Sequence, residues 1–150
     1  MAIRDMQRPT VFGISAVLKT EKGFLLIKEL EDNPSIGKKA GMLSFPTGFC
    51  NPGEHPEDAA VREMLEETGY PAKPVSIIGF YLIGGAFGIA YEMELTGTGE
   101  TAETDADVSE NVWLDGAAVL AMPIRPAVAE IIRDYTAAVR MPLATVTDCR

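Results

Sequence analysis

Short runs of apolar residues recur along most of the chain. Six of these runs are β-prone and bounded by turn residues, which is the pattern typical of β-strands. They span residues 11–18, 24–27, 43–45, 75–83, 87–95 and 111–114. The turn-like residues 20–23 separate the first two runs, and Gly84 and Gly85 suit the turn of a hairpin. We therefore expect a sheet whose strands come from both halves of the chain.

Residues 56–68 predict a helix between the third and fourth strands. Pro56 suits a first helical position, and the two acidic residues after it place negative charge where the helix dipole favours it. Gly69 suits the end of the helix, because glycine adopts the left-handed conformation without a steric penalty.

A second helix is predicted from about residue 126 to about residue 140. Its apolar residues recur at one-face spacing, and we expect this face to cover the sheet. They are Val128, Ile131, Ile132, Tyr135 and Val139. Strands on both sides of one helix, followed by another helix, favour an α/β fold. With 150 residues and 47% hydrophobic composition, the chain is expected to form a single domain over residues 1–150.

Acidic and apolar side chains of the first helix fall on opposite faces at about 100° per residue. The acidic face holds Glu63, Glu66 and Glu67, and the apolar face, which we expect to pack, holds Ala60, Val61, Met64 and Leu65. Like charges at this spacing cost a few tenths of a kcal/mol per pair, so a cation is expected nearby. Hard oxygen ligands suit Mg²⁺, with Mn²⁺ as the alternative.

The charge pattern around this helix is unlike that of an ordinary solvated helix. Residues 52–70 contain six acidic residues, one arginine and no lysine. The single cation, Arg62, has a planar guanidinium that can bind carboxylates through paired hydrogen bonds. We expect it to orient Glu54 or Glu63 rather than to contact a substrate.

The overall charge limits the partners. A net charge of −9 disfavours nonspecific attraction to nucleic acid or to an anionic membrane. No segment is apolar and long enough to span a membrane, and the N-terminus does not resemble a signal peptide, so a cytoplasmic location is expected. Cys50 and Cys149 are too few for a disulfide framework. The sequence leaves the oligomeric state open, including a homodimer.

The spacing between Gly48 and Tyr70 resembles the signature of the Nudix hydrolases. Gly48 is followed after five residues by Glu54, and after seven more by Arg62-Glu63-Met64-Leu65-Glu66-Glu67-Thr68-Gly69-Tyr70. Two departures are Thr47, where the family often has glycine, and Tyr70, where it has an aliphatic residue. The resemblance implies a Nudix-type α/β/α sandwich with a mixed β-sheet.

The same resemblance implies roles for individual residues. Glu63, Glu66, Glu67 and the carbonyl of Gly48 would bind Mg²⁺, and Arg62 would organise the carboxylates around the ion. The catalytic set predicted from the motif consists of Glu63, Arg62 and Glu54. Glu63 is the first choice for the base or for a ligand beside it.

Several residues outside the motif are further candidates. Lys38 or Lys39 could contact a phosphate. The base could instead come from a later acidic loop, or a strand carboxylate could approach the metal, and aromatic side chains could stack on a nucleotide base. The acidic candidates are Asp105, Asp107, Glu110, Glu92 and Glu94, and the aromatic candidates are Phe80, Tyr81 and Tyr91. His55 is expected to be a cap or loop residue.

The function expected from these features is hydrolysis of a phosphoanhydride bond in a nucleoside diphosphate linked to another moiety. The substrate would be a small nucleotide-type molecule. One alternative is a binding or regulatory module with this fold and no catalysis. Another is an isomerase acting on an isoprenoid diphosphate, for which Cys50 would have to be reactive.

Overall fold

The computed structural model describes residues 12–36, 38–83, 85–97, 109–147 and 149. Its described part contains seven strands: β1 (Phe12–Thr20), β2 (Gly23–Glu29), β3 (Leu43–Ser44), β4 (Thr47–Phe49), β5 (Ala72–Ile83), β6 (Ala86–Leu95) and β7 (Ser109–Leu114). The helices are α2 (Pro56–Thr68), α3 (Gly116–Leu120) and α4 (Val128–Thr136), with short 3-10 helices η1 (Pro34–Ile36) and η2 (Leu143–Thr145). Asp105 and Asp107 lie outside the described residues.

The strands form one mixed sheet with the order β3-β2-β1-β6-β5. β1 runs parallel to β6, whereas β1 and β2, and also β5 and β6, are antiparallel. β4 pairs with the first part of β1, and β7 pairs with β2. The pairing of β4 fixes the start of the acidic motif against a central strand.

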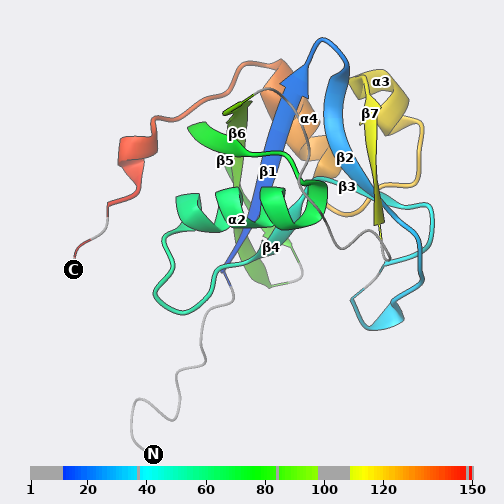
Figure 1. Ribbon diagram of the computed structural model, residues 1–150, viewed down its shortest axis with the longest axis horizontal. Coiled ribbons are helices and arrows are strands. Elements are labelled where there is room, and N and C mark those ends of the chain that lie inside the picture. The colour runs from blue at the N-terminus through cyan, green and yellow to red at the C-terminus, as the bar shows by residue number, and fades with distance from the viewer. Residues whose placement is uncertain (1–11, 37, 84, 98–108, 148, 150) are drawn as a thin grey trace, which may run out of the picture.

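Helices cover both faces of this sheet, and α2 crosses in front of the strands in Figure 1. Alternate strand residues divide between two cores, as expected for a period of two. On the α2 face lie Ile14, Ala16, Leu18, Leu25, Ile77, Ile89, Tyr91 and Met93, together with Ala59, Ala60 and Met64 of the helix. On the α4 face lie Val17, Phe24, Leu26, Ile78 and Ala90, together with Val119, Val128, Ile131 and Ile132. The expected α/β/α sandwich is confirmed.

The predicted elements agree with the observed ones except near the C-terminus and at two short segments. The first helix has the predicted bounds, residues 56–68. The last helix is shorter than predicted, because it ends at Thr136 and Ala138 adopts a φ of 59°. β4 and α3 were not predicted. Among the described residues, no helix is long and apolar enough to cross a membrane.

The apolar face of α2 differs from the prediction. Ala60 and Met64 are fully buried, but Val61 and Leu65 are 36% and 40% exposed. The helix contacts the sheet along a narrow row that also includes Thr68, which is buried and donates a hydrogen bond to the Met64 carbonyl (2.6 Å). The prediction that Val61 and Leu65 pack into the core was wrong, because they lie beside this row.

Substitution at neighbouring positions of α2 tests this packing. Met64→Ala should lower the free energy of unfolding by about 2–5 kcal/mol, because it leaves a cavity between helix and sheet. Leu65→Ala, the matched control, should cost less than about 1 kcal/mol. Urea unfolding followed by circular dichroism measures both. Equal losses would contradict the observed orientation of the helix.

Candidate functional site

Local capping holds the acidic helix at both ends. His55 is the N-cap residue, and its Nδ1 accepts a hydrogen bond from the Glu57 amide (3.1 Å). This confirms the expectation that His55 is a cap residue. At the other end Gly69 has a φ of 77°, and its N–H donates to the Leu65 carbonyl (2.9 Å). The register of the carboxylates on α2 is therefore fixed by both caps.

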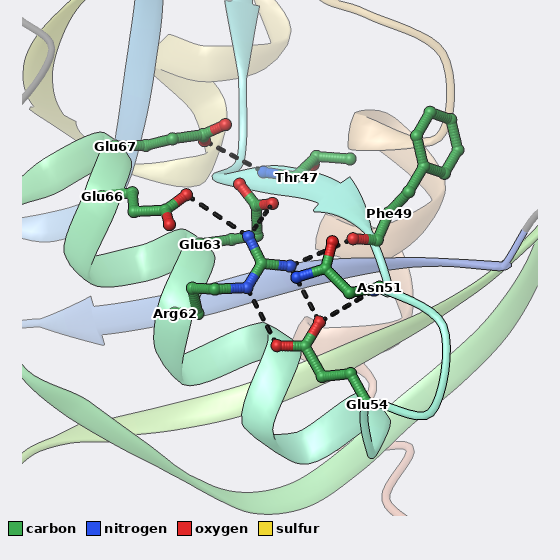
Figure 2. A network of polar contacts seen from close by, with 8 residues as sticks. All are labelled: Thr47, Phe49, Asn51, Glu54, Arg62, Glu63, Glu66 and Glu67. Carbon is green, nitrogen blue, oxygen red and sulfur yellow. Dashed lines mark hydrogen bonds and ion pairs between the residues drawn. The ribbon is translucent and has the colours of Figure 1, made fainter.

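Arg62 lies at the centre of a polar network that joins α2 to the segment before it (Figure 2). Its Nε and one terminal nitrogen donate to the two oxygens of Glu54, both at 2.9 Å. The other terminal nitrogen donates to Glu63 at 2.8 Å and to Glu66 at 3.3 Å. The Phe49 carbonyl also accepts a hydrogen bond, at 3.1 Å. Arg62 therefore contacts both carboxylates that the sequence suggested for it.

Glu54 and Glu63 respond differently to this shared cation. Hydrogen bonds from Arg62, assisted by the Asn51 amide, lower the pKa of Glu54 to about 2. Burial raises the pKa of Glu63 above its ordinary value, although Arg62 opposes the shift. Glu54 is thus a firmly ionised anchor, whereas Glu63 is a desolvated carboxylate that would gain from a second cation.

Glu67 is the last of the three carboxylates along α2, and Arg62 does not bind it. Its carboxylate accepts a hydrogen bond from the Thr47 amide of β4 (3.1 Å), as Figure 2 shows. Burial and the nearby Glu63 raise the pKa of Glu67 to about 8, and Lys38 opposes this shift. A cation beside Glu67 would therefore favour its ionised form.

Gly48 lets the backbone of β4 approach the helix. A Cβ atom at this position would overlap the carboxylate of Glu63. The space beside the Gly48 backbone is thus already filled by an acidic side chain. This explains in steric terms why the motif needs glycine here.

The carboxylates do not enclose a metal site as they stand. Among the residues that the structure describes, no three His, Cys, Asp or Glu side chains are gathered closely enough to hold an ion. Arg62 instead lies between the carboxylates of Glu63 and Glu66. The donor set of hard oxygens nevertheless fits Mg²⁺ or Mn²⁺.

Two acidic candidates outside the motif are held elsewhere. Glu110 pairs with Lys28 at 3.6 Å, and their strand positions place them on the sheet face opposite α2. Glu92 binds Arg140 (3.1 Å) and Ser76 (2.9 Å) on the α4 face. The suggestion that Glu92 approaches the metal was wrong, because β6 turns this residue away from α2. Glu94 is exposed.

Glu29 is a site-facing residue that the sequence did not indicate. It ends β2, is only 5% exposed and lies 3.0 Å from the ammonium of Lys38. Both residues act electrostatically on Glu67. Lys39, by contrast, is exposed. One feature of the sequence could have indicated Glu29. It lies two residues after Ile27 and four after Leu25 on the same strand, so it falls on their buried face, where a charge is unusual.

Two cavities lie on the α4 side of the sheet, and the smaller one reaches Thr47 of β4. The smaller, about 60 Å³, is lined by residues that include Thr47, Ser15 and Arg125. The larger, about 670 Å³, shares Arg125 with it and is also lined by Tyr81 and Glu130. Tyr91, one of the aromatic candidates for stacking, is fully buried in the core and cannot contact a ligand there.

The arrangement of the motif agrees with comparisons to known proteins. The family model described as "NUDIX domain" matches residues 7–135. The chain belongs to the Nudix hydrolase family. An ADP-ribose pyrophosphatase of Methanocaldococcus jannaschii is 30% identical over 143 residues, which cover 88% of this chain and 79% of that protein. Phosphatase NudJ of Escherichia coli is also 30% identical, over 90% of this chain and 89% of its own length.

A solved structure supports the same assignment. A Nudix hydrolase from Nitrosomonas europaea superposes with a TM-score of 0.70 at 26% identity, covering 94% of this chain and 98% of that one. The protein is thus a Nudix pyrophosphohydrolase, as the sequence predicted, and these relatives do not support the catalytically silent alternative. Nudix hydrolases generally use divalent metals.

The pairing of Glu54 with Arg62 predicts a pH dependence of folding. Because its pKa falls from 4.5 to about 2, ionised Glu54 stabilises the folded state fully above about pH 4.5, and this stabilisation is lost as the pH falls toward 2. Glu54→Gln should therefore be less stable than the wild type at pH 7, with a difference that shrinks below about pH 4.5. Urea unfolding across this pH range measures the effect.

The matched control for this experiment is Glu94→Gln, which removes an exposed carboxylate of β6 outside the network. A difference between Glu54→Gln and the wild type that stays constant from neutral to acidic pH would contradict the pairing as the source of the stabilisation.

Proposed function

We propose that the protein hydrolyses a phosphoanhydride bond with Mg²⁺ held by Glu63, Glu66, Glu67 and the Gly48 carbonyl. The observation that carries this proposal is the close approach of the Gly48 backbone to the Glu63 carboxylate, on the side of α2 where Glu67 also meets β4. Mn²⁺ is the alternative ion, since it accepts the same oxygen ligands.

The electrostatics of the carboxylates supports a bound cation. Burial raises the pKa of both Glu63 and Glu67, so each carboxylate is costly to ionise without a positive partner. Arg62 offsets this cost for Glu63 only in part. When bound, a divalent ion supplies charge that polarises the phosphate oxygens and favours ionisation of a nearby water.

The roles of the remaining motif residues follow from their contacts. Arg62, anchored by Glu54 through two hydrogen bonds, holds Glu63 and Glu66 in position. Glu63 is our first choice for the base that accepts the proton of the attacking water, or for a metal ligand beside that base, and its burial makes it a stronger base than an exposed glutamate. Glu54 and Arg62 complete the proposed catalytic set by fixing its orientation.

The substrate is proposed to be a small nucleotide-type molecule, a nucleoside diphosphate linked to another group. We propose that the large cavity beside Tyr81 and Arg125 receives the nucleoside. It shares Arg125 with the smaller cavity, whose lining includes Thr47, the residue whose amide binds Glu67. ADP-ribose is a first candidate, since one relative is named for its hydrolysis. Aromatic and cationic side chains suit a base and a phosphate respectively.

The remaining expectations belong to the same proposal. We propose one Nudix domain over residues 1–150 and a cytoplasmic location. We also propose that the protein binds neither nucleic acid nor anionic membranes, which its net charge of −9 supports. A homodimer stays an open expectation, to be decided by sedimentation.

Loss of the two outer carboxylates tests the metal ligands. Glu66→Gln and Glu67→Gln should each reduce Mg²⁺-dependent kcat/KM by at least about a hundredfold, because a neutral amide binds the ion weakly, while the fold persists. Asp58→Asn, an exposed position in the first turn of α2, is the matched control. Turnover like that of the wild type in both variants would defeat the assignment.

Substitution of Gly48 tests the close approach of β4. Gly48→Ala should push the end of the Glu63 side chain away from its contact with Arg62, so that activity falls at least about tenfold with little loss of stability. Gly97→Ala is the control, since a Cβ there meets only Pro71 at 3.9 Å. Unchanged kcat/KM in Gly48→Ala would contradict the need for this geometry.

A substrate panel tests the reaction itself. ADP-ribose, nucleotide sugars, dinucleoside polyphosphates and nucleoside triphosphates are incubated with Mg²⁺ or Mn²⁺, and products are identified by mass. We expect metal-dependent release of a nucleoside monophosphate from at least one diphosphate-linked substrate. Absence of cleavage across the panel would reject the proposed substrate class.

A further inference from the structure

We propose that Lys38 binds a phosphate group of the substrate and that buried Glu29 is the residue that positions its ammonium. This inference rests on the proposed function, because it adds a phosphate-contacting cation to the same acidic site. It is carried by the ion pair between Lys38 and Glu29. Both residues act electrostatically on Glu67, the last of the three α2 carboxylates.

The backbone around Lys38 is fixed by the loop that joins β2 to β3. The Lys38 and Asn33 backbones exchange two hydrogen bonds, at 2.8 and 3.0 Å. At the base of the loop, Glu29 donates its amide hydrogen to Met42 (3.0 Å) and accepts one from Gly41 (2.7 Å). These hydrogen bonds therefore hold the backbones of Glu29 and Lys38 at set positions.

The strand register directs Glu29 toward the acidic helix. Leu25 belongs to the core under α2, and residues two apart on a strand share a face, so Ile27 and Glu29 continue the same row. On β7, Asn111 lies opposite Ile27 and donates a hydrogen bond to the Thr68 carbonyl at the end of α2 (2.8 Å). Glu29 is the next α2-facing residue of β2 after this contact.

The ion pair joins a buried carboxylate to a partly exposed cation. The side chain of Glu29 is 6% exposed, and burying such a carboxylate is costly even when it is paired. The Lys38 side chain is 25% exposed, so its ammonium lies at the boundary between the buried carboxylate and solvent. Glu29 thus holds a partly exposed cation near Glu67 of the acidic site.

The chemistry of the lysine fits a second, ionic partner. An ammonium group has three donors, and one Glu29 oxygen lies 3.0 Å from it as an ion pair without the geometry of a hydrogen bond. We infer that these donors are used for a phosphate oxygen. Because the site is otherwise lined by carboxylates, a cation here would offset repulsion between a polyanionic substrate and the protein.

A rival role for Lys38 is simply to neutralise buried Glu29. The single and double variants Lys38→Met, Glu29→Gln and Glu29→Gln/Lys38→Met separate the two roles. Removing only the lysine leaves an unpaired buried charge and should destabilise the fold, whereas removing both charges should restore stability close to that of the wild type. Thermal unfolding measures the stability of each variant.

The decisive measurement is binding of inorganic pyrophosphate with Mg²⁺ by isothermal titration calorimetry. Lys38→Met and the stable double variant should both bind pyrophosphate at least about tenfold more weakly than the wild type, since a charge-assisted hydrogen bond is lost. Glu29→Gln should show a smaller loss. In steady-state assays, the loss in these variants should fall mainly on KM.

The matched control is Lys28→Met, which breaks the pair of Lys28 on β2 with Glu110 on β7, on the opposite face of the sheet, and should bind pyrophosphate as the wild type does. If the double variant regains both stability and wild-type affinity, the lysine is only a neutraliser and the inference fails. It fails also if the wild type does not bind pyrophosphate. Absence of turnover on every substrate, with pyrophosphate binding lost in Lys38→Met, would reject the proposed reaction but keep the inference.

Discussion

The guanidinium of Arg62 is the contact on which the acidic site depends. One cation satisfies Glu54, Glu63, Glu66 and the Phe49 carbonyl, which come from α2 and from the segment that precedes it. Without it, neighbouring carboxylates on one helical face would repel one another. The planar fork of arginine can bind several acceptors at once, which the ammonium of a lysine could not do in the same geometry.

The site has two electrostatically different ends. At the Arg62 end Glu54 is kept ionised, with a pKa of about 2. At the β4 end Glu67 has a pKa of about 8 because it is buried and lies near Glu63. Arg62 therefore supplies positive charge at the Glu54 end of the site. At the Glu67 end the cation is Lys38, which is already paired with Glu29.

Local signals predicted the helix but not everything that surrounds it. The bounds of α2 follow from Pro56 and Gly69, which act within one turn. β4 was missed because a segment of only three residues, Thr47–Phe49, becomes a strand only by pairing with β1. Val61 and Leu65 were misjudged because an apolar stripe does not reveal which of its rows meets the sheet. The motif gave the carboxylates, whereas Glu29 could be recognised only after the strands were aligned.

The central place of Arg62 has a consequence for how the protein is made and handled. Since one amino-acid side chain bridges the acidic groups, α2 is joined to the segment before it by atoms of the protein itself. This joint should persist whether or not a divalent ion is present, which would make this chain suited to comparing different metals in one and the same scaffold.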